Sequence, residues 1–173
     1  GFIEQIEALG KGGADGIIIE TMTSLEETLL AVRAVKENTD LVAMATMTFD
    51  LGPRGFFTMM GVTPEDAVTE IRKSGADVVG ANCGNGIENM VQIAKKMRKA
   101  DDGFLIIHSN AGIPEIINGR IIYAETPEFM AEKFKEMIEL KINIFGGCCG
   151  TTPQHINSIK SMTKQQINKG KNK

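Results

Sequence analysis

The sequence is poor in cysteine and has no long apolar run. It holds three cysteines in 173 residues, an odd and sparse count that is unlike the dense, even set of a disulfide-stapled secreted domain. No stretch approaches the roughly 18 apolar residues of a membrane span, and the start of the chain lacks the basic and apolar segments of a secretion signal. We therefore expect a cytoplasmic protein without a membrane partner, in which the cysteines serve metal binding or catalysis.

A surplus of positive charge is also missing. The 19 lysines and arginines are outnumbered by 22 aspartates and glutamates, whereas a nucleic-acid-binding protein usually carries clustered excess lysine and arginine. Nucleic acid is therefore not an expected partner. The one basic segment, residues 164–173, is polar and terminal, so we interpret it as a flexible tail without a function of its own. Residues 1–163 are expected to form one domain.

Short apolar runs suited to buried parallel strands alternate with amphipathic helical segments. The helices carry start signals, a Ser24 to Glu27 capping box and three Thr-Pro pairs that begin at Thr63, Thr126 and Thr152. This alternation predicts one α/β domain, either an open doubly wound sheet or part of a (βα)₈ barrel. The expected strands lie at 16–19, 41–48, 77–80, 104–107 and 142–145.

Polar and sulfur-bearing side chains gather at the expected carboxyl ends of these strands, and this favours the barrel, because barrel enzymes build their active sites on that face. An open sheet with a nucleotide site needs a glycine-rich phosphate loop after its first strand, and none is present. An intact barrel takes about 250 residues and eight strands, so we predict a partial (βα)₈ TIM barrel of about strands 4 to 8. Its open edges would favour self-association. The clustered residues are Glu20, Thr46, Thr48, Cys83, His108, Asn110, Cys148 and Cys149.

Cys83, Cys148 and Cys149 are the candidate ligands of one metal ion. Neighbouring residues of a regular strand point to opposite faces, so Cys148 and Cys149 can share a metal only beyond a strand end, where the flanking glycines let the chain curl. Three thiolates suit Zn²⁺ and leave one tetrahedral position open, as in catalytic zinc sites. A thiol substrate is indicated, because a zinc-bound thiol is deprotonated. The alternative is a buried Gly-Cys-Cys-Gly turn with inert thiols.

Two segments resemble the homocysteine S-methyltransferase family. They are Gly-Ala-Asn-Cys-Gly at 80–84 and Ile-Phe-Gly-Gly-Cys-Cys-Gly-Thr-Thr-Pro at 144–153. The resemblance begins at Asp15 and covers about the last two-thirds of the family domain. It implies a barrel whose zinc is held by the three cysteines and whose fourth ligand becomes the sulfur of homocysteine, which is methylated to methionine.

The resemblance also implies roles for Glu20 and Asn110 in binding the substrate. Glu20 matches the family glutamate that anchors the substrate ammonium, and a carboxylate that ends an apolar run independently implies a cationic partner. The alternative is a salt bridge within the barrel. Asn110 resembles an asparagine that occupies the open zinc position in methionine synthases before substrate arrives, or it serves the local backbone. We expect His108 to be a hydrogen-bonded structural residue and His155 to lie in the first turn of a helix.

Two functional hypotheses follow. The first is a zinc-dependent methyltransferase, whose methyl donor is methylcobalamin or methyltetrahydrofolate through another domain or protein, betaine or S-methylmethionine; the sequence leaves these open. The second is a truncated, catalytically incomplete zinc-binding module, because the first three strands of the family domain, with their glycine-rich segment and an acidic substrate contact, are absent. The segment 49–57 has glycine hinges and would close over substrate, contact a donor-carrying module or simply pack against the barrel.

Overall fold

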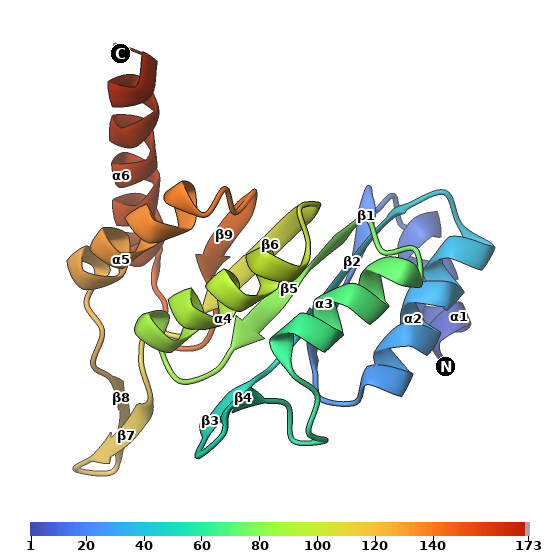
Figure 1. Ribbon diagram of the computed structural model, residues 1–173, viewed down its shortest axis with the longest axis horizontal. Coiled ribbons are helices and arrows are strands. Elements are labelled where there is room, and N and C mark those ends of the chain that lie inside the picture. Colours follow the sequence, from blue (N-terminus) through green and yellow to red (C-terminus); the bar gives the residue numbers. More distant parts are fainter. Residues whose placement is uncertain (172–173) are drawn as a thin grey trace.

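The computed structural model describes residues 1–171 as a five-stranded parallel sheet with helices packed against it (Figure 1). The sheet order is β1-β2-β5-β6-β9, so its strands lie side by side in the order in which they occur along the chain. This order and direction are those of consecutive βα units in a barrel. The strands are β1 (Gly16–Met22), β2 (Val42–Met47), β5 (Val78–Cys83), β6 (Phe104–Ser109) and β9 (Ile144–Gly147).

Each expected helix start is confirmed. The hydroxyls of Ser24, Thr63 and Thr126 accept hydrogen bonds from backbone N–H groups three residues later, and the last helix begins at Pro153. This last helix continues to Lys171, through most of the predicted basic tail, whose final two residues lie outside the described part of the chain. The boundary between residues 163 and 164 stays a prediction. The helices are α1 (Phe2–Lys11), α2 (Leu25–Asn38), α3 (Pro64–Lys73), α4 (Ile87–Ala100), α5 (Pro127–Glu139) and α6 (Pro153–Lys171).

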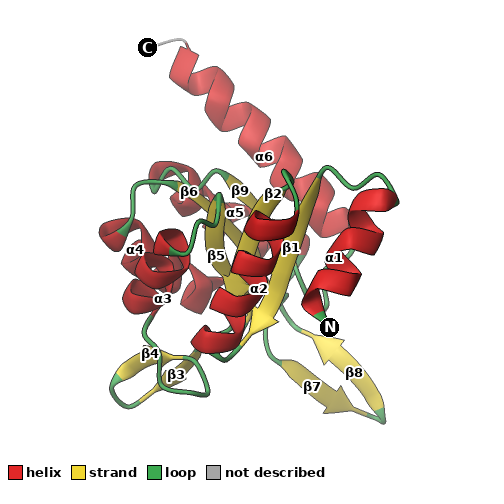
Figure 2. Ribbon diagram, turned by 90° about the vertical axis from the view of Figure 1, so that its right-hand side faces the viewer, coloured by secondary structure: helices red, strands yellow, loops and turns green. Residues whose placement is uncertain are grey.

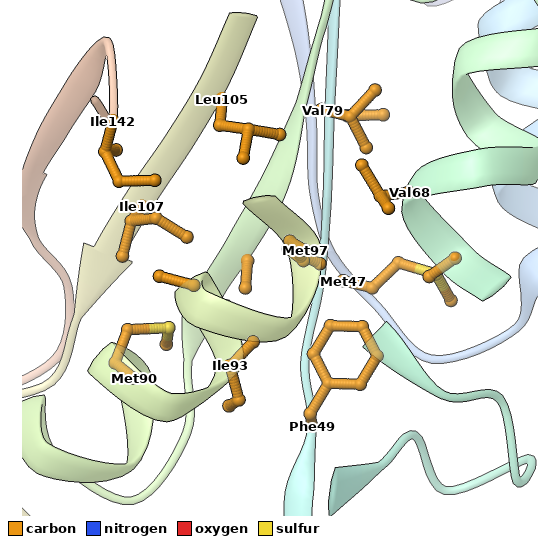
Figure 3. Packing of buried hydrophobic residues seen from close by; sticks show 14 of the residues in the cluster. Met47, Phe49, Val68, Val79, Met90, Ile93, Met97, Leu105, Ile107 and Ile142 are labelled. Atoms are coloured by element: carbon orange, nitrogen blue, oxygen red, sulfur yellow. The ribbon is translucent and has the colours of Figure 1, made fainter. Parts of the chain in front are cut away.

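The hydrophobic core lies between the helices and one face of the sheet (Figure 3). Val79 and Leu105 of the strands are fully buried there, together with Val68 of α3 and Met97 of α4. No layer of the described chain covers the opposite face, where Ile18 is 38%, Ile144 40% and Phe104 63% exposed, although side chains in the middle of that face, such as Ile106, are buried by their neighbours. The sheet thus has one packed face and one open face.

Two hairpins that the strand pattern did not predict follow the carboxyl ends of β2 and β6. In Figure 2 both extend beyond the sheet on the side to which β1 points. The second hairpin turns through Asn118 and Gly119, which both have positive φ, as a two-residue hairpin turn requires. The segment 49–57 forms the first hairpin, with Phe49 and Phe56 buried. The hairpin strands are β3 (Asp50–Gly52), β4 (Gly55–Phe57), β7 (Pro114–Ile117) and β8 (Arg120–Tyr123).

Within the described residues, no helix combines the length and the apolar character that crossing a membrane requires.

Candidate metal centre

The structure brings the three predicted cysteine ligands together. Cys83 is the last residue of β5, whereas Cys148 and Cys149 follow β9, two strands away in the sheet (Figure 1). Their three sulfur atoms nevertheless lie within 4.8 Å of one another, and the sulfurs of the adjacent pair are 4.0 Å apart. All three thiols are free. The cluster lies at the carboxyl ends of parallel strands, where barrel enzymes build their sites.

Backbone hydrogen bonds from the end of β6 hold the turn that carries the cysteine pair. The Cys148 N–H donates to the carbonyl of Ser109 at 2.7 Å, and the Ala111 N–H donates to the carbonyl of Cys149 at 2.9 Å. Gly150 then takes a positive φ of 78°, a conformation that glycine adopts without steric cost. Of the three flanking glycines, Gly150 alone supplies the predicted conformational freedom, and the chain curls directly after the strand so that both sulfurs lie close together.

The environment of Cys149 disfavours a bare thiolate. Burial, together with the neighbouring sulfurs of Cys148 and Cys83, raises the pKa of this thiol to about 11. Several anionic sulfurs at this spacing repel one another unless a cation lies between them. The cluster is therefore suited to a metal cation rather than to three independent thiolates.

Asn110 bridges the two cysteine-bearing loops. Its Nδ2 donates to the carbonyl of Gly84 at 2.8 Å, and its Oδ1 accepts from the N–H of Cys149 at 2.9 Å. The side chain is only 5% exposed. The amide therefore fills the local backbone role that the sequence left open, and a further role as an exchangeable ligand stays a prediction.

Asn82, which sequence reasoning did not single out, is the most connected polar side chain beside the cluster. Its Oδ1 accepts from the Thr21 N–H at 2.8 Å and from the Thr46 hydroxyl at 2.7 Å. Its Nδ2 donates to the Thr21 hydroxyl at 2.7 Å and points at Cys148 Sγ, 3.8 Å away. Its role could be recognised only from contacts to residues 36 to 66 positions away in the sequence.

Glu20 requires a correction. The sequence predicted a carboxylate at the end of a buried run, but the side chain is exposed. The physical reason is that Glu20 lies on the opposite face of β1 from the buried Ile17 and Ile19, and no layer of the described chain covers that face. Its expected role at the substrate ammonium stays a prediction. Glu20 forms no ion pair within the described residues.

His108 belongs to the same open face. Burial lowers the pKa of its imidazole, and the carboxylate of Glu20 partly offsets this shift, which indicates that the two side chains act on each other electrostatically. Contrary to expectation, its ring makes no hydrogen bond within the described part of the chain. Its ring lies beside Gly146 on the neighbouring strand β9.

A second polar network links the loop after Cys83 to the loop after the cysteine pair. His155, in the first turn of α6 as predicted, is buried and accepts from the Thr152 N–H on Nδ1 at 3.1 Å. Its Nε2 lies 2.9 Å from the carbonyl of Glu125 and therefore donates to it. The Glu125 carboxylate accepts from the N–H of Ile87, the first residue of α4. The start of α4, which follows the Cys83 loop, is thus tied to the start of α6, which follows the cysteine pair.

Comparison with known proteins agrees with this geometry. The sequence matches the homocysteine S-methyltransferase family over residues 1–163. The chain belongs to this family. The predicted resemblance is therefore confirmed, and it extends over more of the chain than the two cysteine segments that indicated it.

The fold of this chain is similar to those of several solved barrel enzymes. The apo form of the homocysteine methyltransferase MmuM from Escherichia coli matches with a TM-score of 0.73 and 20% identity over 93% of this chain and 56% of MmuM. Its metallated form matches with a TM-score of 0.71 and 21% identity over 92% of this chain and 50% of MmuM. The carboxyl transferase domain of Rhizobium etli pyruvate carboxylase matches with a TM-score of 0.55 and 13% identity, over 84% of this chain and 23% of that one.

These likenesses confirm the predicted partial barrel. The chain spans about half the length of the E. coli enzyme that it matches, in agreement with a five-stranded sheet where a closed barrel has eight strands.

Proposed function

We propose that this chain carries the metal-binding and thiol-activating part of a zinc-dependent homocysteine S-methyltransferase. The observation that supports the proposal is the gathering of three sulfurs within 4.8 Å at the carboxyl ends of the strands. Bonds of about 2.3 Å in a tetrahedral arrangement would hold two sulfurs about 3.8 Å apart, and the sulfurs of Cys148 and Cys149 are 4.0 Å apart. The donor set therefore fits Zn²⁺ in chemistry, and the adjacent pair also fits it in spacing.

Cys83, Cys148 and Cys149 would hold the ion and leave one position for a substrate sulfur. When bound there, Zn²⁺ supplies Lewis acidity that deprotonates a thiol at neutral pH. Glu20, exposed on the open face of β1, offers a carboxylate to the ammonium group of homocysteine. Asn110 keeps the two cysteine-bearing loops together. These residues position a nucleophilic sulfur, which would take a methyl group in line from its donor to give methionine.

The methyl donor is proposed to arrive from outside the chain. Methylcobalamin or methyltetrahydrofolate held by another domain or protein would meet the sulfur at the open face of the sheet. A cytoplasmic setting is part of the proposal, because three free thiols persist in a reducing compartment.

The second candidate function is that of a catalytically incomplete zinc-binding module. The open face of the sheet supports it, because side chains there are exposed that an intact barrel would enclose. Both candidates need the zinc site, but only the first needs a substrate sulfur to enter it.

Zinc-edge X-ray absorption separates the two functions. We expect about three sulfur neighbours around zinc in the protein alone and about four after homocysteine is added. Homoserine is the matched control, because it keeps the ammonium and carboxylate groups and replaces the thiol with a hydroxyl. A count that stays at three with homocysteine would favour the module. Full zinc retention by Cys83→Ala would contradict the three-cysteine site itself.

A further inference from the structure

We propose that Asn82 is a positioning residue that couples the sulfur of Cys148 to the segment of β1 that presents Glu20. This inference rests on the proposed function and adds a residue to it. Asn82 directly precedes Cys83 on β5 and is 1% exposed, so its amide is shielded from water. Its contacts reach Thr21 on β1 and the turn after β9, on opposite sides of its own strand.

The segment of β1 beside Asn82 is irregular. The pairing of β1 with β2 shifts between Ile19 and Met22, so that two residues of β1, Glu20 and Thr21, lie opposite Thr46 alone. Such bulges re-aim a side chain near the end of a strand. Thr21 has a φ of 61°, a left-handed conformation that is unfavourable for a β-branched residue. Something must therefore hold Thr21 in place.

Asn82 supplies that support, and the same contacts fix the orientation of its amide. A backbone N–H can only donate, so the group that faces the Thr21 N–H at 2.8 Å must be Oδ1. Nδ2 then faces the Thr21 hydroxyl at 2.7 Å and Cys148 Sγ at 3.8 Å. Two acceptor and two donor contacts use the full hydrogen-bonding capacity of the amide. An N–H aimed at Cys148 Sγ fixes the position of that sulfur relative to β5 and the end of β1.

One side chain therefore serves both halves of the site. It holds the bulge that aims Glu20 and donates to a sulfur of the metal-binding cluster. Partners of this kind, one step removed from the metal, orient its ligands and typically change metal affinity 10–100-fold when they are altered.

The test compares Asn82→Asp with Thr46→Val in the full chain, with Zn²⁺ as the probe and a chromophoric chelator as competitor. Aspartate keeps acceptors for Thr21 and Thr46 but turns an oxygen toward Cys148. We expect its zinc dissociation constant to rise about 10–100-fold. Thr46→Val removes one hydrogen bond from Asn82 and leaves the sulfur contact, so its affinity should stay close to that of the wild type. With Co²⁺ as the probe, the sulfur-to-metal charge-transfer band should move in Asn82→Asp alone.

The bulge is tested at saturating zinc with homocysteine and with 4-mercaptobutyrate, which lacks the ammonium group. Asn82→Asp should keep the wild-type preference for homocysteine, whereas Asn82→Ala, which no longer holds Thr21, should lose it. A preference that survives in Asn82→Ala would overturn the link to Glu20.

A measurement on the wild-type chain keeps the inference testable if the variants do not fold. In protein loaded with ¹¹³Cd, the side-chain amide proton of Asn82 should show a through-hydrogen-bond coupling to the metal. Absence of that coupling, or equal zinc affinity in Asn82→Asp and Thr46→Val, overturns the role of Asn82 and leaves the proposed function intact. A wild-type chain that binds no zinc would contradict both the role of Asn82 and the proposed function.

Discussion

Glu20 is the residue whose proposed role depends most on charge alone, because its side chain is exposed and has no protein partner among the described residues. We predict that Glu20→Gln weakens homocysteine binding to the zinc-loaded chain about tenfold, since a hydrogen bond between charged groups is worth about 1.5–3 kcal/mol and exposure places this one at the lower end. Binding of 4-mercaptobutyrate should not change, because that ligand has no ammonium group. Isothermal titration calorimetry with both ligands measures the difference, and an equal loss for both would contradict an ammonium contact.

Asp77 gives the fold an acid-sensitive contact. The N–H of Ala43 donates to its carboxylate at 2.8 Å, and this hydrogen bond, helped by Lys36, holds the pKa of Asp77 below its usual value. A folded-state pKa below the unfolded value of about 3.9 favours the folded state above that pH. The contribution is lost as the pH falls through the folded-state pKa.

We therefore predict that Asp77→Asn lowers the free energy of unfolding at pH 7 by no more than about 1 kcal/mol, since the carboxylate is 42% exposed and screened. The difference from wild type should shrink below about pH 4. Asp15→Asn is the matched control. The sequence Gly-Ala-Asp occurs both at 13–15 and at 75–77, so Asp15 corresponds to Asp77, but its side chain makes no hydrogen bond within the described residues. Urea unfolding between pH 3 and 7 is the measurement. If the free energy of unfolding of the wild type falls with decreasing pH no more steeply than that of Asp77→Asn, Asp77 is not the source of the acid sensitivity.

At the scale of the elements, the start of α3 rests on one side chain. The hydroxyl of Thr63 accepts from the Asp66 N–H at 3.1 Å, which satisfies a donor that the helix itself leaves unpaired. Thr63→Ala should therefore lower the free energy of unfolding by about 1 kcal/mol. Thr69→Ala in the same helix is the control, because the Thr69 hydroxyl only bonds back to a carbonyl within the helix and alanine has the higher helix propensity. Similar losses from both substitutions would show that the cap is not the cause.

The elements that sequence reasoning recovered are those specified by local signals. Buried strands show as short apolar runs and helix starts as Thr-Pro pairs, so the main sheet and the capped helices could be predicted. The second hairpin carried a readable signal as well, because Asn118-Gly119 between two apolar runs is typical of a tight hairpin turn. It was missed because these runs are four residues each and do not continue the βα alternation.

The residues of the candidate site likewise differ in whether a local sequence signal reveals them. Cysteines and glycines at strand ends are visible in the sequence, and so the three sulfurs could be predicted to converge. Asn82 and Glu125 could not be predicted, since an asparagine or glutamate has no recognisable role until the fold brings its partners to it, 61 residues away for Thr21 and 38 for Ile87. The exposure of Glu20 depends on what covers its face of the sheet, and no local sequence pattern shows this.

For the whole molecule, the decisive feature is that the sheet has two unpaired edge strands and an uncovered face. β1 and β9 each have one neighbour in the described chain, and unpaired strand edges together with exposed apolar side chains promote association. A groove between β9 and α6, with a volume of about 420 Å³ and Ile144 and Ile156 in its lining, extends the apolar surface around one edge. We expect this surface to be covered, either by further strands of the barrel or by another copy of the chain.

Phe104 provides the test of that expectation for the chain alone. Its side chain is 63% exposed on the open face, so Phe104→Glu should shift sedimentation coefficients at micromolar concentrations toward the monomer, because a buried unpaired carboxylate would oppose association. Ile116→Glu is the matched control: Ile116 is 80% exposed but lies on the β7–β8 hairpin, away from the sheet, and should leave association unchanged. Dissociation by Ile116→Glu alone would move the contact from the open face to the hairpin. A wild-type chain that stays monomeric at high concentration would mean that charge and hydration of the open face suffice to keep a partial barrel in solution.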